Sequence, residues 1–129
     1  MLVYEKIRAS CQQLDDYKLV GNKTRARDLY DIYKILTNTR QTNLREAVLD
    51  QCNFYILENI FKAKDVPLEL MLKLDSKKSD LAEDYKTKVI PQISADEIEE
   101  FDYIFFYNKN LFENLFKEYQ NYKTFQDII

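Results

Sequence analysis

A chain of 129 residues is long enough for one compact domain and too short for two ordinary ones. An apolar fraction of 46% argues against a disordered segment, and one glycine and two prolines are too few for the many tight turns of a sheet-rich fold. Histidine is absent, which excludes Ser–His and Cys–His nucleophilic schemes and most zinc sites. The sequence therefore predicts a single all-α domain over residues 1–129, a compact bundle of about five to six helices.

The net charge of −3 hides an uneven distribution of charge along the chain. Residues 18–45 contain seven basic and two acidic side chains, a balance of +5. An excess of this kind is found at sites that bind a polyanion, although a solvated basic helix face is the commoner explanation. The charge pattern alone leaves both interpretations open.

Apolar residues recur at helical spacing along most of the chain. The pattern predicts helices, in chain order, over residues 2–14, 25–36, 43–62, 68–74 and 79–91, and a long final helix from residue 94 onward. Thr24 has the side chain of an N-cap for the second helix, and Thr42 or Asn43 has it for the third. Pro67 suits the first turn of the fourth helix, whereas Pro91 would end the fifth because its ring clashes with a continuing helix.

The second helix is apolar on two sides. One face carries a row of apolar and aromatic residues, namely Ala26, Leu29, Tyr30, Tyr33 and Leu36. Ile32 and Ile35 lie on another side, because successive residues turn by about 100° around a helix. Either such a helix packs against two layers, of which the second is a missing domain or another copy of the chain, or it is enclosed by its own domain. Periodicity leaves these alternatives open.

The final helix carries the clearest pattern. Ser94-Ala-Asp-Glu97 matches the capping-box motif, in which a glutamate follows a serine by three residues. An apolar stripe with helical period follows it, made of Ile98, Phe101, Phe105, Phe112, Leu115, Phe116 and Tyr119. Stripes of this kind are far more often core than ligand-binding surface, so these side chains are predicted to be buried.

The cysteines indicate the compartment. Cys11 and Cys52 both fall in apolar helical patterns, which predicts buried free thiols in a reducing cytoplasm. No signal peptide is visible in the sequence, and no apolar run approaches the roughly 20 residues that a membrane-spanning helix needs. We therefore expect a cytoplasmic protein that does not interact with a membrane.

The acidic residues give no metal-binding motif. Asp15–Asp16, Glu83–Asp84 and Glu99–Glu100 are adjacent pairs, whose side chains diverge on a helix, so they are predicted to be solvated. Asp15–Asp16 also opens a polar link over residues 15–22. The sequence contains no Asp-x-Asp pair that would hold two magnesium ions, and its one glycine rules out a glycine-rich phosphate loop.

Two segments of the chain together resemble a known family. The first is Glu5-Lys6-Ile7-Arg8-Ala9, and the second is Arg25-Ala26-Arg27-Asp28-Leu29-Tyr30-Asp31-Ile32-Tyr33. Their residue types, order and spacing are similar to the third and fourth motifs of the AbiEii/AbiGii-type nucleotidyltransferase toxins, which have a polymerase-β-like fold. Those motifs read Glu-Lys-Leu-Arg-Ala and Arg-x-Arg/Lys-Asp-Leu/Phe-Tyr-Asp-Leu/Ile-Tyr. The resemblance implies the C-terminal, helical part of such an enzyme.

The resemblance also implies roles for two residues, and their chemistry suggests a role for two more. Lys6 matches a lysine that is thought to contact nucleotide phosphates. Asp28 matches an aspartate that is thought to act beside the metal-binding carboxylates, as a base or orienting group. Arg25 and Arg27 would hold phosphates or a nucleic-acid backbone. The complete enzyme would use Mg²⁺ to transfer a nucleotide from an NTP to an acceptor such as tRNA, as a toxin in a toxin–antitoxin or abortive-infection system.

The sequence departs from the family in two respects. Gln13 stands where members often have an arginine, and the Gly-Ser and Asp-x-Asp motifs of the family's first half are absent. Phosphoryl transfer needs a metal ion and positioned phosphates, so we expect this chain to be inactive alone and to require the missing nucleotidyltransferase half or a second copy. An antitoxin and tRNA are further partners that the resemblance suggests. A second hypothesis is a non-catalytic module that docks protein or RNA, with Ile32 and Ile35 on the docking face.

Overall fold

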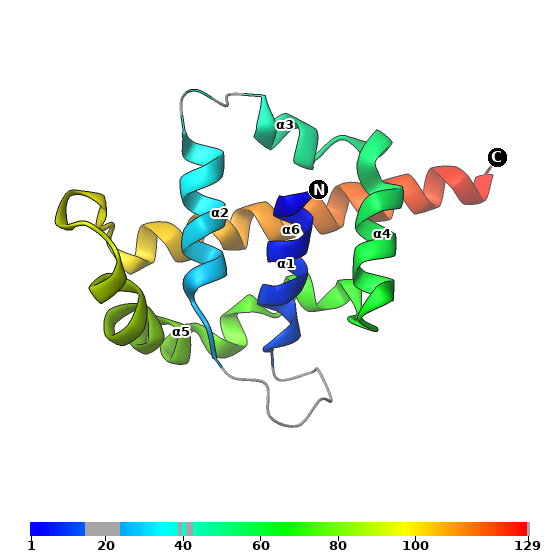
Figure 1. Ribbon diagram of the computed structural model, residues 1–129. Coiled ribbons are helices and arrows are strands. Elements are labelled where there is room, and N and C mark those ends of the chain that lie inside the picture. Colours follow the sequence, from blue (N-terminus) through cyan, green and yellow to red (C-terminus); the bar gives the residue numbers. More distant parts are fainter. Residues whose placement is uncertain (15–23, 39, 41–42, 129) are drawn as a thin grey trace.

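The computed structural model describes residues 1–14, 24–38, 40 and 43–128, and every regular element in these ranges is helical. The α-helices are α1 (Leu2–Gln12), α2 (Arg27–Thr37), α3 (Leu44–Val48), α4 (Phe54–Ala63), α5 (Lys78–Asp84) and α6 (Phe101–Ile128). Short 3-10 helices lie between them, η2 (Gln51–Asn53), η3 (Leu68–Leu72), η4 (Leu74–Lys77), η6 (Ile90–Gln92) and η7 (Ala95–Glu97), and the π-helix η5 (Tyr85–Val89) continues α5. The helices form a compact bundle (Figure 1), so the prediction of an all-α fold is confirmed.

The long helix α6 runs along the molecule behind α2, α1 and α4 (Figure 1). Phe105, Phe112 and Leu115 on its inner face are fully buried, and the other α6 members of the predicted stripe are buried or half-buried. Asn108 on this face donates hydrogen bonds to the carbonyl oxygens of Leu29 and Ile104, at 3.0 and 2.9 Å. The predicted core stripe is therefore confirmed along α6 but is wrong for Ile98, which precedes the helix and is 41% exposed. In the described ranges, no helix is both long and apolar enough to cross a bilayer.

The two-sided helix α2 is enclosed by helices of its own domain. Ile7 and Cys11 of α1 are fully buried, as is Leu29 of α2. Ile32, on the second apolar side, is also 0% exposed, and Ile35 is half-buried against the core. Of the two alternatives for this helix, the structure has the enclosed one. Of the docking face predicted at Ile32 and Ile35, Ile32 is thus interior and Ile35 is partly covered.

The third predicted helix, over residues 43–62, is broken into two. α3 ends at Val48, and the Asp50 side chain then accepts a hydrogen bond from the Cys52 backbone N–H at 2.9 Å. This local bond stabilises a turn in place of the helix, because it satisfies a backbone donor that the helix would otherwise use. The Asn53 amide donates to the Ala47 carbonyl at 2.8 Å and closes the corner. Cys52 is exposed at this corner, so the predicted burial is right for Cys11 and wrong for Cys52.

Several helix boundaries also differ from the predictions. Thr24 does not cap the second helix, which begins at Arg27 after Ala26 and has no side-chain cap. Ser94 and the residues after it form only the short helix η7, and the Ser94 side chain makes no capping hydrogen bond. The long helix begins later, at Phe101. A sequence that fits a capping box therefore does not form one here, and Ile98 is left exposed before α6.

The two prolines lie at element boundaries. Pro67 occupies the residue before η3 rather than its first turn. Pro91 lies in η6, where the predicted fifth helix ends. Between α5 and η6 the backbone forms the π-helix η5, which periodicity did not predict.

Candidate functional site

Lys6 of α1 faces the first turns of α2. Its Nζ donates a hydrogen bond to Asp31 Oδ2 at 3.0 Å and lies 3.7 Å from Asp28 Oδ1. Lys6 and Asp28 are 22 residues apart in the sequence. The packing of α1 against α2 therefore brings the two motifs of the family resemblance together.

Two arginines extend this group of charges. Arg27 Nε donates a hydrogen bond to Asp31 Oδ1 at 3.0 Å, and the Arg27 guanidinium lies 5.6 Å from the centre of the Tyr30 ring, within cation–π range. Arg25 Nε lies 3.9 Å from Asp28 Oδ2, and its side chain is 68% exposed. All four residues predicted for the site are thus in one region of the molecule.

Asp31 links these ion pairs, and its role was not predicted from the sequence. It follows Arg27 by four residues and Asp28 by three, a spacing that places all three on one helix face. That spacing is a signal from which Asp31 could have been predicted. Lys6, Arg27, Asp28 and Asp31, hereafter the α1–α2 charge cluster, contain two cations and two anions. The cluster is therefore neutral in sum and joins α1 to α2.

The segment that precedes α2 is held by two buried polar side chains. Gln13 donates from Nε2 to the Arg25 carbonyl at 2.9 Å and accepts from the Arg25 N–H at 2.6 Å. On the other side, Asp84 Oδ2 accepts from the Ala26 N–H at 2.8 Å. Gln13 is the position where the family often has arginine, and here its amide matches a backbone donor and acceptor, which an arginine does not. These bonds fix the backbone from which Arg25 and Arg27 project.

Asp84 corrects the prediction that the adjacent acids are solvated. Glu83 is exposed as predicted, but Asp84 is only 8% exposed. Its Oδ2 caps the Ala26 N–H, and its Oδ1 lies 3.6 Å from Lys88 Nζ. Glu99 is half-buried and Glu100 is exposed. The predicted link over 15–22, with its acidic pair, lies outside the described residues.

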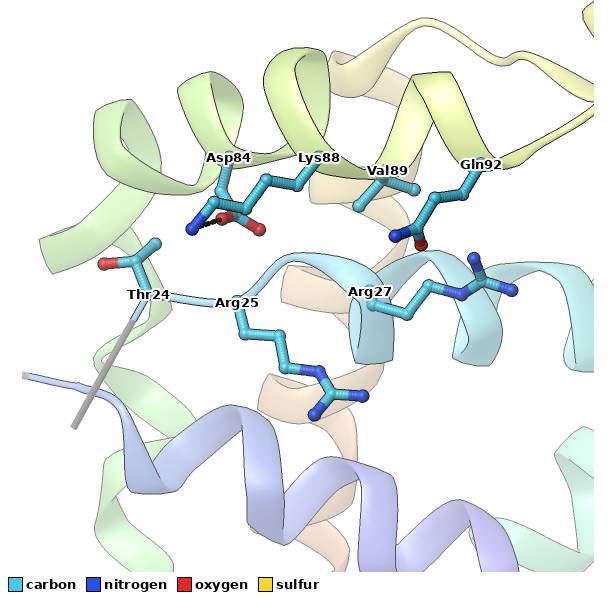
Figure 2. A pocket seen from close by; sticks show the side chains of 7 residues that line it. All are labelled: Thr24, Arg25, Arg27, Asp84, Lys88, Val89 and Gln92. Atoms are coloured by element: carbon cyan, nitrogen blue, oxygen red, sulfur yellow. Dashed lines mark ion pairs between the residues drawn. The ribbon is translucent and has the colours of Figure 1, made fainter.

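A cleft of about 390 Å³ opens between the start of α2 and the helical wall of α5, η5 and η6 (Figure 2). It is lined by Thr24, Arg25, Arg27, Asp84, Lys88, Val89 and Gln92. Among the described residues that line this α2–α5 cleft, three side chains are cationic and one is a carboxylate, so unlike the charge cluster this lining has an excess of positive charge. In Figure 2 the Arg25 side chain extends away from the α5 wall, toward α1, and therefore lies between the two regions.

One wall of the cleft is the π-helix η5. Lys88 and Val89 lie on it, and Asp84 immediately precedes it. π-Helices occur mostly as single turns and are frequent at functional sites. The Tyr85 hydroxyl anchors this turn by donating to the Glu99 carbonyl at 2.6 Å, and burial raises the pKa of that hydroxyl. The phenol therefore stays protonated as a donor at neutral pH.

No group of three or more possible metal ligands from His, Cys, Asp and Glu occurs in the part of the chain that the structure describes. No protein-family model matches the sequence, and comparison with the curated proteins and with the solved structures gives no match. The function must therefore be inferred from the chemistry of the charge cluster and the cleft.

Proposed function

We propose that this chain is the C-terminal helical part of an AbiEii/AbiGii-type nucleotidyltransferase toxin. In the complete enzyme, Lys6 contacts the phosphates of an NTP and Asp28 acts beside metal-binding carboxylates. The products of this reaction are a nucleotide-modified acceptor, for which tRNA is the candidate, and pyrophosphate.

The proposal is supported above all by the separation of Lys6 Nζ from Asp28 Oδ1, which is 3.7 Å. The resemblance was recognised in two sequence segments that need not have been neighbours in the fold. An active site requires its groups within a few ångströms of the reacting atoms. The contact between the two motif residues meets this requirement, whereas widely separated positions would have removed the basis for assigning them to one site.

The chemistry of the two side chains fits their proposed roles. A lysine ammonium is a compact cation that attracts a phosphate as a point charge, and a carboxylate can accept a proton from an attacking hydroxyl or orient a metal-bound group. Asp28 is buried and has cations on both sides, Lys6 at 3.7 Å and Arg25 at 3.9 Å. The Asp28 carboxylate therefore lies between a cation of α1 and a cation of the segment before α2.

The chain does not supply the whole site. The sequence has neither a Gly-Ser segment nor an Asp-x-Asp pair, and the described residues contain no cluster of metal ligands. We therefore assign the binding of Mg²⁺ and the first contacts to the NTP to a separate nucleotidyltransferase half. The chain alone should transfer no nucleotide and should bind NTP–Mg²⁺ weakly or not at all.

The first test is to read the DNA immediately upstream of the Met1 codon. We expect a frame that encodes a Gly-Ser segment followed by an Asp-x-Asp pair. Its product, co-expressed with this chain, should transfer label from an NTP to an acceptor in a pool of tRNA. If the combined halves transfer no nucleotide from any one of the four NTPs, so that all four fail, the proposal is contradicted.

The second test asks whether the predicted residues carry the activity. Lys6→Ala and Asp28→Ala should each abolish transfer by the combined halves. Lys34→Ala is the matched control for Lys6→Ala. It also removes one lysine from a half-buried position, but in α2 and outside the cluster. It should leave transfer unchanged. Full activity of Lys6→Ala or Asp28→Ala would refute the role assignment.

A further inference from the structure

The α2–α5 cleft presents positive charge that its own carboxylate does not neutralise. Lys88 is 70% exposed, and its Nζ lies 3.6 Å from Asp84, outside hydrogen-bond distance. Arg27 uses Nε for its hydrogen bond to Asp31. A guanidinium carries five N–H donors, so this bond occupies one of them. Two cations of the cleft wall therefore have donors to offer to a ligand.

We propose that the α2–α5 cleft binds a phosphate group. Lys88 and Arg27 supply the charge, from opposite walls of the cleft, and the Thr24 hydroxyl and Gln92 amide supply neutral donors. Hydrogen bonds between charged donors and phosphate oxygens are about twice as strong as neutral ones, which makes the cations the main contributors. Asp84 is a positioning residue that attracts Lys88 and fixes the backbone at Ala26.

The arrangement is organised before a ligand binds. The buried carboxylate of Asp84, on the α5 wall, joins the two walls because its Oδ2 accepts from the Ala26 N–H of the α2 segment. Its other oxygen lies 3.6 Å from Lys88 Nζ on the same wall. Gln13 holds the same segment from the α1 side through both polar groups of the Arg25 backbone. A cleft held in this way loses little entropy when it binds an anion, and so gains affinity from few contacts.

The lining also limits what accompanies the phosphate. None of the described residues that line it has an aromatic ring on which a nucleobase could stack. A nucleic-acid backbone and a free polyphosphate both present the group that the cleft fits, and neither needs a base to be held there. The inference rests on the proposed function only in assigning Arg25 and Arg27 to phosphate. It requires neither catalysis nor Lys6 and Asp28.

The test measures binding to the full chain by two probes. One is a fluorescent single-stranded RNA of about 12 nucleotides, longer than the few nucleotides that one cleft contacts, followed by anisotropy. The other is pyrophosphate, followed by calorimetry. Lys88→Ala should lower the affinity for whichever probe the cleft binds by about tenfold, as expected for a lost charge-assisted hydrogen bond. Lys86→Ala is the matched control, because Lys86 is an exposed lysine on the same π-helix that does not line the cleft.

The two probes distinguish the sources of the phosphate. If the ligand is RNA, the logarithm of the binding constant falls as the logarithm of the salt concentration rises, and Lys88→Ala should reduce the magnitude of this slope by about one. Lys88→Arg should restore the affinity. If pyrophosphate alone binds and responds to Lys88, the source is a free polyphosphate. The inference is overturned if neither probe binds, or if Lys88→Ala and Lys86→Ala have equal effects. The test measures binding to the chain alone and not nucleotide transfer, so a failure here is separable from a failure of the proposed function.

Discussion

The charge cluster between α1 and α2 and the cleft between α2 and α5 share the segment Arg25–Arg27 but balance their charges differently. In the cluster, two cations face two carboxylates, with hydrogen bonds of 3.0 Å to Asp31. Among the described residues that line the cleft, three are cationic and one, Asp84, is a carboxylate, although the Arg25 side chain extends toward α1. The comparison separates charge that holds helices together from charge that remains for a ligand. Arg27 is a member of both regions, since it bonds to Asp31 and also lines the cleft, and Arg25 lies between the two.

The two regions also differ in how their carboxylates are bound. Asp84 is buried and accepts a hydrogen bond from a backbone N–H, so its loss leaves a buried donor unsatisfied. Asp31 is half-buried, and in the described hydrogen bonds its side chain accepts only from the Lys6 and Arg27 side chains. If Asp31 is removed, water can hydrogen-bond to these two cations in its place. We therefore expect removal of Asp84 to destabilise the fold more than any single change in the cluster.

The largest effect is predicted for Asp84→Ala. The free energy of unfolding should fall by about 1–3 kcal/mol, because the buried Ala26 N–H loses its acceptor. Asp80→Ala on the same helix is the control, since the Asp80 side chain is 65% exposed. It should change stability by less than about 0.5 kcal/mol. Urea unfolding followed by circular dichroism measures both, and equal losses would show that Asp84 does not hold α2 to α5.

A smaller loss is predicted for Gln13→Ala, which breaks the other attachment of the same segment. Two hydrogen bonds to the Arg25 backbone disappear, and a net contribution near 1 kcal/mol for each gives a loss of about 1–2 kcal/mol. Gln120→Ala, at an exposed position of α6, is the matched control and should be nearly neutral. If Gln13→Ala is as stable as the control, the segment is held by Asp84 alone.

Smaller still are the effects expected within the charge cluster. Asp31→Asn weakens two hydrogen bonds and should cost about 0.5–1 kcal/mol, less at high salt. Asp28→Asn weakens ion pairs of 3.7 and 3.9 Å and should cost less than Asp31→Asn. Unfolding at low and high salt gives both values. A greater loss for Asp28→Asn would mean that Asp28, and not Asp31, joins the two helices.

The last prediction sharpens the comparison without changing stability. Cys11 lies in α1 and is buried, which raises the pKa of its thiol and removes it from reagents, whereas Cys52 is exposed. A thiol reagent should modify Cys52 in the native chain and Cys11 only in urea. Lys88→Ala should preserve this pattern, because the cleft does not hold α1. Rapid modification of Cys11 in the native chain would show that α1 separates readily from α2.

Much of the fold was predictable because its signals are local. The helical period of α1, α2 and α6 follows from apolar faces that each helix carries in its own sequence, and these faces form the core. The break at Asp50 was missed because the apolar residues on both sides of Asp50 continue the helical period. The helix ends because the Asp50 side chain accepts a hydrogen bond from the Cys52 N–H, and the turn that this bond stabilises competes with the helix. The residues from Ser94 fit a capping box yet form only η7.

The site was predictable only in part. Lys6 and Asp28 were predicted from the resemblance and Arg25 and Arg27 from their chemistry, and the structure brings the four together. Asp31 could have been added from its spacing on α2. Asp84 could not, since its main partner is a backbone N–H 58 residues away and its neighbour Glu83 is an ordinary exposed acid. A buried polar residue whose partner is distant backbone has no signature in a single sequence.

The claim that Asp28 serves nucleotide transfer, and is not only one member of a balanced cluster, is tested most directly by comparing Asp28→Asn with Asp31→Asn. Both substitutions remove one negative charge from α2 and keep the side-chain shape. Transfer by the combined halves should fall by about 10²-fold or more for Asp28→Asn, as expected for a lost acid–base group, and persist largely intact for Asp31→Asn. Equal activity of the two variants would contradict the account.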